Sequence, residues 1–428
     1  MKKVVFASTV FPFPIDNGKK LVIWGILKYL IERYGAKQVT YVLLGSENVA
    51  SSITDLPCKC VVLGKPSTLR RLRNILWFTL VRRSKSIQEL MIYSEELGRT
   101  LRAIIAGIGP DLVICDTFRV GQFLETHERS KSTYVLYMDD LFSVRYQKTL
   151  DVLRRFPQAQ MNLLGNFAHF VPPILRPLVR LGFMQKRILH LEKRLVEKRE
   201  QNCVSWFDTC LLINRDETSS LRKKTEHPSL HTVKPLLESY GSESPRRYTG
   251  EPVFVFLGAL NVPHNHFSIV HFIEGHMDEI MEEIPGVKLR VVGRGRSDRL
   301  VRLAERYAGV VSLEGFVEDL DAVFRESCAM IVPLLFGSGV KIKTLEALSR
   351  GLPIISTDFG VEGIPVTSTV NCVIENDIAR YPRLMSAATD VNYNLAISKA
   401  ARRFYSEHYS KDQVFKEYSL LLKTDNDV

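Results

Sequence analysis

Short runs of apolar residues alternate along this chain with longer stretches whose apolar positions recur at helical spacing. Short runs bounded by turn-forming residues are typical of buried strands. They occur at Val4–Val10, Val39–Leu44, Val61–Leu63, Asp111–Cys115, Tyr134–Tyr137, Thr209–Ile213, Val253–Leu257, Val287–Val292, Val310–Leu313 and Cys328–Leu335. Leu21–Tyr34 is typical of the helical stretches. The alternation predicts an α/β protein built on parallel, doubly wound sheets.

A segment rich in proline and glycine divides this pattern into two halves. His227–Gly250 contains Pro228, Pro235, Pro245 and two glycines, a composition typical of a linker. We therefore expect an N-terminal domain of residues 1–235, a linker at 236–250 and a C-terminal domain of residues 251–402. The last part, Tyr381–Lys423, has the periodicity of helices.

The stretch with the clearest chemical meaning is Phe336–Gly351, which reads FGSGVKIKTLEALSRG. It follows the apolar run Cys328–Leu335 and precedes a second run at Ile354–Thr357, so it predicts strand, glycine-rich loop, helix of about three turns and strand. The glycines let the loop backbone approach a ligand closely. A helix that begins near Val340 offers unpaired N–H groups and a positive dipole end, which together can bind a phosphate.

Three charged residues of this helix sharpen the expectation. Lys341 and Lys343 fall in the first turn, where the helix dipole disfavours cations, so an anion is expected to compensate them. Glu346 follows Lys343 by three residues and shares its face, where a carboxylate can accept hydrogen bonds from a ribose diol. The alternative is a βα unit whose glycines serve tight packing and whose lysines are solvated.

The segment GSGVKIKTLEALSRGLPIIST, followed by Gly360–Ile364, resembles the donor site of the retaining GT-B glycosyltransferases of the group 1 type, family GT4. The resemblance implies two Rossmann-like domains facing a central cleft, with the terminal helices, residues 403–428, crossing back onto the first domain. It implies sugar transfer from a nucleotide-diphospho-sugar with retention. The family often carries two glutamates here; the second matches Glu346, but the first falls on Ser338, so its sugar contacts are not carried over.

The same resemblance extends the expected donor site to other loops. In such enzymes the first loop, which ends here at Gly18, faces the donor phosphates, and the turn after Glu314 meets the nucleobase. A common arginine is absent from the loop at Gly258, which leaves phosphate binding and leaving-group stabilisation to Lys343, the expected catalytic residue. The expected donor-binding residues are Gly18, Gly258, Asn265, Gly293, Phe316, Val317, Ser338, Gly339, Val340, Lys341 and Glu346.

Acidic residues follow two predicted strands of the N-terminal half. Asp116 ends one strand, and Asp139 and Asp140 end another. Ligands of doubly wound sheets bind at the carboxyl ends of the strands, so these side chains are expected on the functional edge. Asp140, our second catalytic candidate, or Asp139 can orient an acceptor hydroxyl. The alternative is that at least one of the pair caps the next helix.

Net charge adds candidate partners. The formal charge of +11 favours nucleic acid, anionic lipid or phosphorylated substrates as partners. Leu69–Ser86 contains basic residues and no acid around an apolar centre with Trp77 and Phe78. That composition indicates contact with an anionic membrane surface; the alternative is a packed helix with solvated arginines. Arg145–Lys198 is basic and helical, broken by Pro172, and is expected to be an insertion in the N-terminal domain.

The cysteines, the N-terminal segment and the lengths of the apolar runs restrict the class of protein. The seven cysteines lack metal-type spacing and indicate free thiols in a reducing compartment. The apolar part of MKKVVFASTV is too short for a signal peptide, and no window suits a transmembrane helix. We therefore expect a cytoplasmic protein that can also lie peripherally on the inner face of the cytoplasmic membrane. We expect it to use neither a cofactor nor a catalytic metal.

The sequence favours a metal-independent glycosyltransferase with a UDP- or GDP-sugar donor and a glycan, lipid-linked or small-molecule acceptor, as in bacterial polysaccharide synthesis. A UDP-sugar 2-epimerase type of the same fold is a rival, although no array of cleft carboxylates and histidines is evident. A basic nucleic-acid-binding protein is a third hypothesis, but no recognised nucleic-acid motif occurs.

Overall fold

The computed structural model describes residues 2–15, 18–45, 55–125, 131–155, 182–237 and 246–423. The chain forms two compact units. Unit 1 takes in Met1–Asp151, Asn162–Leu236 and Val414–Val428, and unit 2 takes in Val152–Met161 and Leu237–Gln413. Pro172 and most of the predicted linker, residues 238–245, lie outside the described residues.

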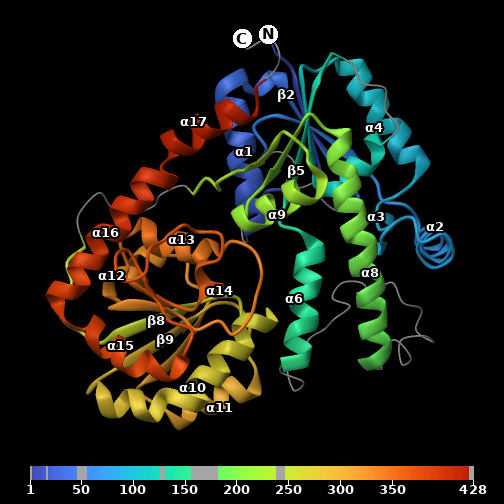
Figure 1. Ribbon diagram of the computed structural model, residues 1–428. Coiled ribbons are helices and arrows are strands. Elements are labelled where there is room, and N and C mark those ends of the chain that lie inside the picture. The colour runs from blue at the N-terminus through green and yellow to red at the C-terminus, as the bar shows by residue number, and fades with distance from the viewer. Residues whose placement is uncertain are drawn as a thin grey trace. The chain divides into compact units, whose positions relative to one another are not determined.

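Unit 1 contains a parallel sheet with strand order β3-β2-β1-β4-β5-β6-β7 (Figure 1). The strands are β1 (Val4–Ser8), β2 (Val39–Leu44), β3 (Lys59–Leu63), β4 (Leu112–Asp116), β5 (Thr133–Asp139), β6 (Thr209–Leu212) and β7 (Leu230–Thr232). β1, β2 and β4 are buried at every position, because helices cover both faces of a parallel sheet. The sequence analysis did not predict β7, whose three residues are too few to show a period.

The helices of unit 1 connect these strands. They are α1 (Gly18–Tyr34), α2 (Thr68–Asn74), a π-helix η3 (Ile75–Val81), α3 (Ile87–Leu90), α4 (Glu95–Ile108), α5 (Thr117–Gly121), α6 (Phe142–Arg155), α8 (Gly182–Cys203), α9 (Arg215–Thr225) and α17 (Lys411–Leu421), with 3-10 turns η1 (Ala36–Gln38), η4 (Gln122–Leu124) and η7 (Val204–Trp206). α17 packs on α1, where Tyr29 lies edge-on to Phe415 and Tyr418.

Unit 2 contains a second parallel sheet with order β10-β9-β8-β11-β12-β13. Its strands are β8 (Val253–Leu257), β9 (Lys288–Val292), β10 (Val311–Gly315), β11 (Ala329–Val332), β12 (Ile354–Ser356) and β13 (Val373–Ile374). Its helices are α10 (Pro263–Glu283), α11 (Asp298–Arg306), α12 (Leu320–Glu326), α13 (Ile342–Ser349), α14 (Asp358–Val361), the 3-10 turn η8 (Ile378–Arg380), α15 (Tyr381–Ala388) and α16 (Val391–Tyr409). The expected α/β fold class with two doubly wound sheets is confirmed.

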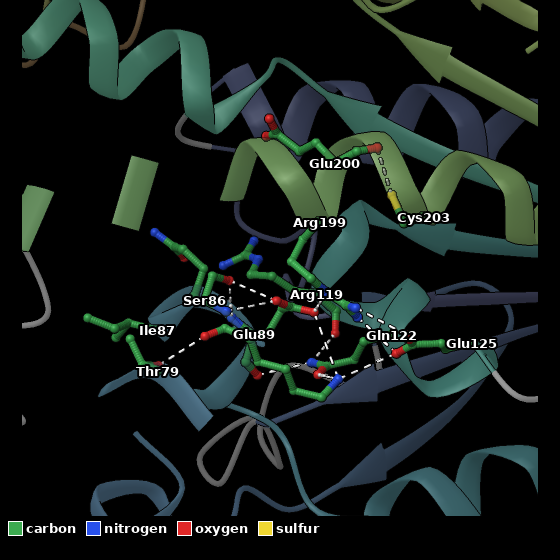
Figure 2. Close-up of polar contacts among 12 residues, drawn as sticks. Thr79, Ser86, Ile87, Glu89, Arg119, Gln122, Glu125, Arg199, Glu200 and Cys203 are labelled. Atoms are coloured by element: carbon green, nitrogen blue, oxygen red, sulfur yellow. Dashed lines mark hydrogen bonds and ion pairs between the residues drawn. The ribbon is translucent and has the colours of Figure 1, made fainter. Parts of the chain in front are cut away.

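A buried ionic network joins α8 to α3 and to the end of η4 (Figure 2). Nε of Arg199 donates to Glu89 over 2.8 Å, and the two terminal nitrogens donate to both oxygens of Glu125. The other Glu89 oxygen accepts the N–H and hydroxyl of Ser86, which completes a capping box at the start of α3. Glu89 is fully buried, so its charge depends on these partners.

We expect Arg199→Met to destabilise unit 1 by about 3–5 kcal/mol, because it leaves Glu89 as a buried charge without its main partner. Urea unfolding followed by the fluorescence of Trp206, whose ring lies under the Arg199 guanidinium, measures this loss. Adding Glu89→Gln to Arg199→Met should restore part of the stability. Arg403→Met, which removes an exposed pair with Glu407, is the control and should leave the free energy of unfolding nearly unchanged. If Arg199→Met and Arg403→Met lower the free energy of unfolding equally, the buried network stabilises the protein no more than an exposed ion pair does.

Candidate functional site

The strand order of unit 2 reverses between β8 and β11, which lie side by side although β9 and β10 separate them in sequence. Ligands of open α/β sheets bind outside the carboxyl ends of the strands at such a switch point. The loops after β8 and β11 therefore form the candidate site. They carry five of the expected donor-binding residues, which are Gly258, Ser338, Gly339, Val340 and Lys341, and Asn265 lies in the first turn of α10 after the first of these loops.

Two glycines allow the backbone to close up at this edge. A Cβ on Gly293, after β9, would lie 1.9 Å from the carbonyl oxygen of Gly258, so no larger residue fits. A Cβ on Gly258 would in turn strike the side chain of Asn265 at 2.8 Å. Both expected donor-site glycines therefore have a steric role: they bring the end of β9 and the start of α10 against the end of β8.

The loop after β11 is closed by Lys341. Its ammonium donates to the carbonyl oxygens of Ser338 and Gly339, over 2.9 and 2.6 Å. Gly337 and Gly339 have φ angles of 149° and 75°, values that favour glycine. The expected start of the helix near Val340 is wrong: α13 begins at Ile342, Lys341 is its N-cap, and the helix has eight residues. Lys341 thus acts within the loop itself.

Lys343 lies in the first turn of α13 and is half-buried. Its ammonium donates to Oδ1 of Asn265 over 3.0 Å and lies 4.7 Å from the centre of the Phe256 ring. The Asn265 amide nitrogen donates to the carbonyl of Ala259, which fixes the orientation of the amide. Among the residues that the structure describes, no carboxylate lies within ion-pair distance of Lys343.

This environment disfavours the charge of Lys343. Burial, with Lys341 nearby, lowers the pKa of Lys343 to about 7. A lysine held without a counter-charge next to the N-terminus of a helix gains most from an anion, because the anion restores the electrostatic balance that burial removed. We therefore expect an anion to compensate the charge of Lys343. The ammonium of Lys341 already donates to carbonyl oxygens of its own loop.

Glu346 lies one turn beyond Lys343 and is half-buried. Burial raises the pKa of Glu346, and Arg350 partly opposes that rise. Among the described residues its carboxylate oxygens accept no hydrogen bond, although its backbone carbonyl accepts one from Ser349. A partly desolvated carboxylate with open acceptor positions is suited to bind ligand hydroxyls.

An exposed aromatic residue follows β10. Phe316 is 58% exposed, and the guanidinium of Arg294 lies 4.3 Å from the centre of its ring. Val317 beside it is half-buried. The sequence analysis expected Phe316 and Val317 to meet the nucleobase but missed Arg294, and it also missed Phe256 beneath Lys343. Arg294 could have been recognised, because it stands between Gly293 and Gly295 directly after a predicted strand.

Unit 1 has its own switch point, between β1 and β4, and acidic residues lie at the carboxyl ends of β4 and β5 as expected. The ammonium of Lys19, from the first turn of α1, lies 2.5 Å from Asp116 and 3.3 Å from Asp139. Asp116 also accepts the hydroxyl of Ser8 at the end of β1. The expected residue Gly18 is not part of the loop after β1 but the first residue of α1, beside Lys19.

Asp139 and Asp140 differ in their surroundings. Asp140 is buried, and both of its oxygens accept hydrogen bonds from Arg145, which lowers its pKa against the effect of burial. Asp139 has an unusual φ of 68°, accepts the hydroxyl of Tyr137, and has its pKa raised by burial. Asp139 is therefore the better placed of the two to accept a proton or to bind a hydroxyl group.

The hypothesis that one of these aspartates caps the next helix is wrong. The backbone N–H groups at the start of that helix donate to other carboxylates. The backbone N–H of Leu141 donates to Glu217, and those of Phe142 and Ser143 donate to Glu200. Glu200 comes from α8 and Glu217 from α9, both remote in sequence. No local pattern could have revealed these caps.

The described residues contain neither a metal-ligand cluster nor a membrane-spanning helix. No group of three or more histidine, cysteine or acidic side chains is arranged to hold a metal ion there. Within the same residues, no helix combines the length and apolarity needed to cross a membrane.

Residues 251–382 match the family described as "Glycosyl transferases group 1". The chain is also similar to a Klebsiella pneumoniae protein described as an uncharacterized 44.6 kDa protein in the cps region. The two are 27% identical over 244 residues, which make up 54% of this chain and 60% of that protein. The match thus covers less than two-thirds of the relative. The resemblance noted in the sequence is confirmed for the donor-site segment.

Solved structures agree over the whole chain. TarM of S. aureus has a TM-score of 0.67 at 9% identity, and each chain is covered to 99%. Sucrose-phosphate synthase of Thermosynechococcus elongatus has a TM-score of 0.65 at 14% identity, with 98% of each chain covered. HepE of Anabaena, solved with UDP-glucose, has a TM-score of 0.61 at 12% identity and 99% coverage of each chain. The chain has the GT-B fold.

In this GT-B protein the low pKa of Lys343 predicts a pH-dependent affinity for nucleotide. Above about pH 7 the free site holds mostly a neutral amine, and a bound diphosphate favours the ammonium, so binding should take up a proton. Affinity for a diphosphate should therefore fall as pH rises from about 7 to 9. Calorimetry in buffers of different ionisation enthalpy measures the uptake. Lys343→Arg, which stays charged, is the control and should bind without it; equal proton uptake in both proteins would rule out Lys343 as the titrating group.

Proposed function

We propose that this protein is a glycosyltransferase that transfers a sugar from a nucleotide-diphospho-sugar to an acceptor hydroxyl. The observation that carries the proposal is Lys343, a desolvated lysine without a carboxylate partner among the described residues, at the switch point of unit 2. The family match over residues 251–382 and the GT-B fold point the same way. HepE was solved with UDP and with UDP-glucose, which favours a uridine nucleotide as the donor here.

The chemistry follows from charge development. The bond between the anomeric carbon and the phosphate oxygen breaks, and the nucleoside diphosphate leaves with added negative charge. Protonated Lys343 and the N–H groups at the start of α13 stabilise that charge in the transition state, a task that otherwise falls to a metal ion. Glu346 accepts the ribose hydroxyls, and Phe316 with Arg294 lies on the nucleobase side. Metal independence and retention at the anomeric carbon are parts of this proposal.

On the acceptor side we assign the orienting role to Asp139 in place of Asp140. Both oxygens of Asp140 are engaged by Arg145, whereas Asp139 has a raised pKa and a partly exposed carboxylate. Lys19 holds Asp139 in place through an ion pair of 3.3 Å. Asp139 therefore hydrogen-bonds the acceptor hydroxyl, whose proton passes to the departing diphosphate as the new glycosidic bond forms.

The test of the donor site is Glu346→Gln. A hydrogen bond to a charged group is worth about 1.5–3 kcal/mol, so the change should weaken UDP binding roughly ten- to a hundredfold. Titration calorimetry gives the affinity, and a thermal melt checks the fold. Glu305→Gln, an exposed substitution on α11, is the matched control and should leave the affinity unchanged. If UDP binds Glu346→Gln as tightly as it binds the unaltered protein, Glu346 does not contact the ribose.

A panel of UDP-, GDP-, ADP- and dTDP-sugars in thermal-shift experiments then identifies the donor. Incubation with the stabilising donor alone separates transfer from isomerisation, because an epimerase would convert the sugar without an acceptor. Binding of DNA or RNA at physiological ionic strength would instead favour the nucleic-acid hypothesis.

We also propose that the segment formed by α2 and η3 contacts an anionic membrane surface. It exposes a group of large apolar side chains, which are Leu69, Leu76, Trp77, Leu80 and Val81. Four basic residues lie exposed among them: Arg70, Arg73, Arg82 and Arg83. Two other basic residues of Leu69–Ser86 are turned inward. Arg71 is buried, and Lys85 contacts Glu125 and the ring of Tyr93. Figure 1 shows α2 at the outer edge of unit 1, beyond α3.

Each basic residue near an anionic surface contributes about 1 kcal/mol, so four of them are enough for reversible attachment. We expect the protein to sediment with phosphatidylserine vesicles at low salt. Replacing Arg70, Arg73, Arg82 and Arg83 by glutamine should release it without changing its affinity for UDP. The same four-fold exchange at exposed arginines of unit 2, Arg302, Arg325, Arg383 and Arg403, is the control. A protein that stays in the supernatant at low salt would show that the exposed side chains serve another purpose.

A further inference from the structure

The segment of α2 and η3 borders a groove that the membrane contact does not explain. The segment is inserted between the carboxyl end of β3 and α4, so it lies at the functional edge of the unit 1 sheet. Between it and α4 lies a hollow of about 570 Å³, lined on one wall by Arg73 and Trp77 and on the other by Arg99. A second hollow, of about 410 Å³, adjoins the first and shares Tyr93, Ser94, Glu95 and Arg99 with it.

The polar lining of the two hollows is basic in balance. Five cations, Arg70, Arg73, Lys85, Arg99 and Arg102, face three carboxylates, Glu95, Glu96 and Glu125. Two of the carboxylates are paired already: Glu96 with Arg70, and Glu125 with Arg199 and Lys85.

Two of the cations have neither a carboxylate partner nor a hydrogen bond among the described residues. Arg73 on α2 and Arg99 on α4 are exposed, and neither has a hydrogen bond or ion pair among the described residues. Arginine presents a planar group of donors that matches the oxygens of a phosphate, and two arginines on opposite walls can bind one phosphate between them.

The remaining lining is aromatic. Tyr93 forms the floor shared by the two hollows; its ring is stacked on Phe123 at 6.3 Å and lies edge-on to Phe78 at 5.7 Å. Trp77 lies at the mouth of the larger hollow and is 47% exposed. Two further apolar side chains of η3, Leu76 and Leu80, are also exposed. The groove therefore joins an anion-binding wall to an apolar path that leads toward solvent.

The groove rests on a firm base. Lys85 and Glu125 of the second hollow belong to the ionic network around Arg199. Figure 2 shows Glu125 beside Arg199 in this network. Gln122 adds hydrogen bonds to the backbone carbonyls of Glu89 and Arg119, and Thr79 of η3 donates to the carbonyl of Lys85. η3 and α3 are thus fixed to α5 and α8, so the η3 wall is held in place before a ligand arrives, which lowers the entropic cost of binding.

We propose that this groove binds one phosphorylated amphiphile, with the phosphate between Arg73 and Arg99 and the aliphatic chain against Tyr93, Trp77 and the apolar face of η3. Two sources share this chemistry: an isoprenoid phosphate and a membrane glycerophospholipid. The identification of an isoprenoid phosphate as the anchor of the sugar acceptor rests on the proposed function; the binding site itself does not.

The test measures direct binding by calorimetry, with farnesyl phosphate and dihexanoyl phosphatidic acid each kept below the concentration at which it aggregates. Saturable one-to-one binding of at least one of them is expected, and the tighter ligand identifies the source. Farnesol and inorganic phosphate, which carry only one half of the chemistry, should bind at least about tenfold more weakly. Quenching of fluorescence that is lost in Trp77→Phe would place the chain at the mouth of the groove.

The variant Arg73→Gln with Arg99→Gln should weaken the binding at least about tenfold, because both charge-assisted contacts are lost. The matched control is Arg302→Gln with Arg325→Gln, which removes two exposed arginines of unit 2 that do not line the groove. It should change the affinity by less than about twofold. Equal weakening in both variants would mean general electrostatic attraction and would overturn the site, as would a failure of both amphiphiles to bind.

The same proteins are titrated with UDP. Normal UDP affinity with no amphiphile binding overturns only this inference, and amphiphile binding without UDP binding overturns only the proposed donor site. Thermal melts check that the variants are folded, and Arg73 and Arg99 are exposed and without ion pairs to lose.

Discussion

Burial of both faces of a parallel sheet is the constraint from which the rest of this structure follows. In β1, β2 and β4 every residue is buried, so a polar group can reach solvent only where a strand ends. Both units repeat this arrangement, and in both the charged residues collect at the switch point of the sheet. Lys19 with Asp116 and Asp139 occupies that place in unit 1, and Lys343 with Asn265 occupies it in unit 2.

The two clusters are opposite in electrostatic character. In unit 1 the ammonium of Lys19 is paired with two carboxylates, an arrangement that suits neutral, hydroxyl-bearing ligands. In unit 2 the lysine has an amide and an aromatic ring as neighbours, and burial works against its charge. The difference arises from which residues follow the strands and not from any difference in sheet topology.

Sequence reasoning succeeded where the information is local. Apolar runs located most strands, and the glycines and lysines of Phe336–Gly351 located the loop of the candidate site. It failed where partners come from afar. Nothing near Asp140 in sequence indicated that Glu200 would cap the helix after it, and the spacing of the lysines could not show that Lys341 would bind its own loop. β7 escaped because a strand of three residues carries no period.

The position of α17 has a consequence for how the protein is made. This helix covers α1, with Phe415 and Tyr418 against Tyr29, and the Tyr418 hydroxyl donates to the carbonyl of Lys234. Yet the ribosome reaches α17 only after it has synthesised all of unit 2. Unit 1 must therefore wait with an apolar side of α1 uncovered while unit 2 folds. Unit 1 is therefore begun first and completed last during synthesis. In that interval the uncovered apolar side of α1 is a surface that chaperones can bind.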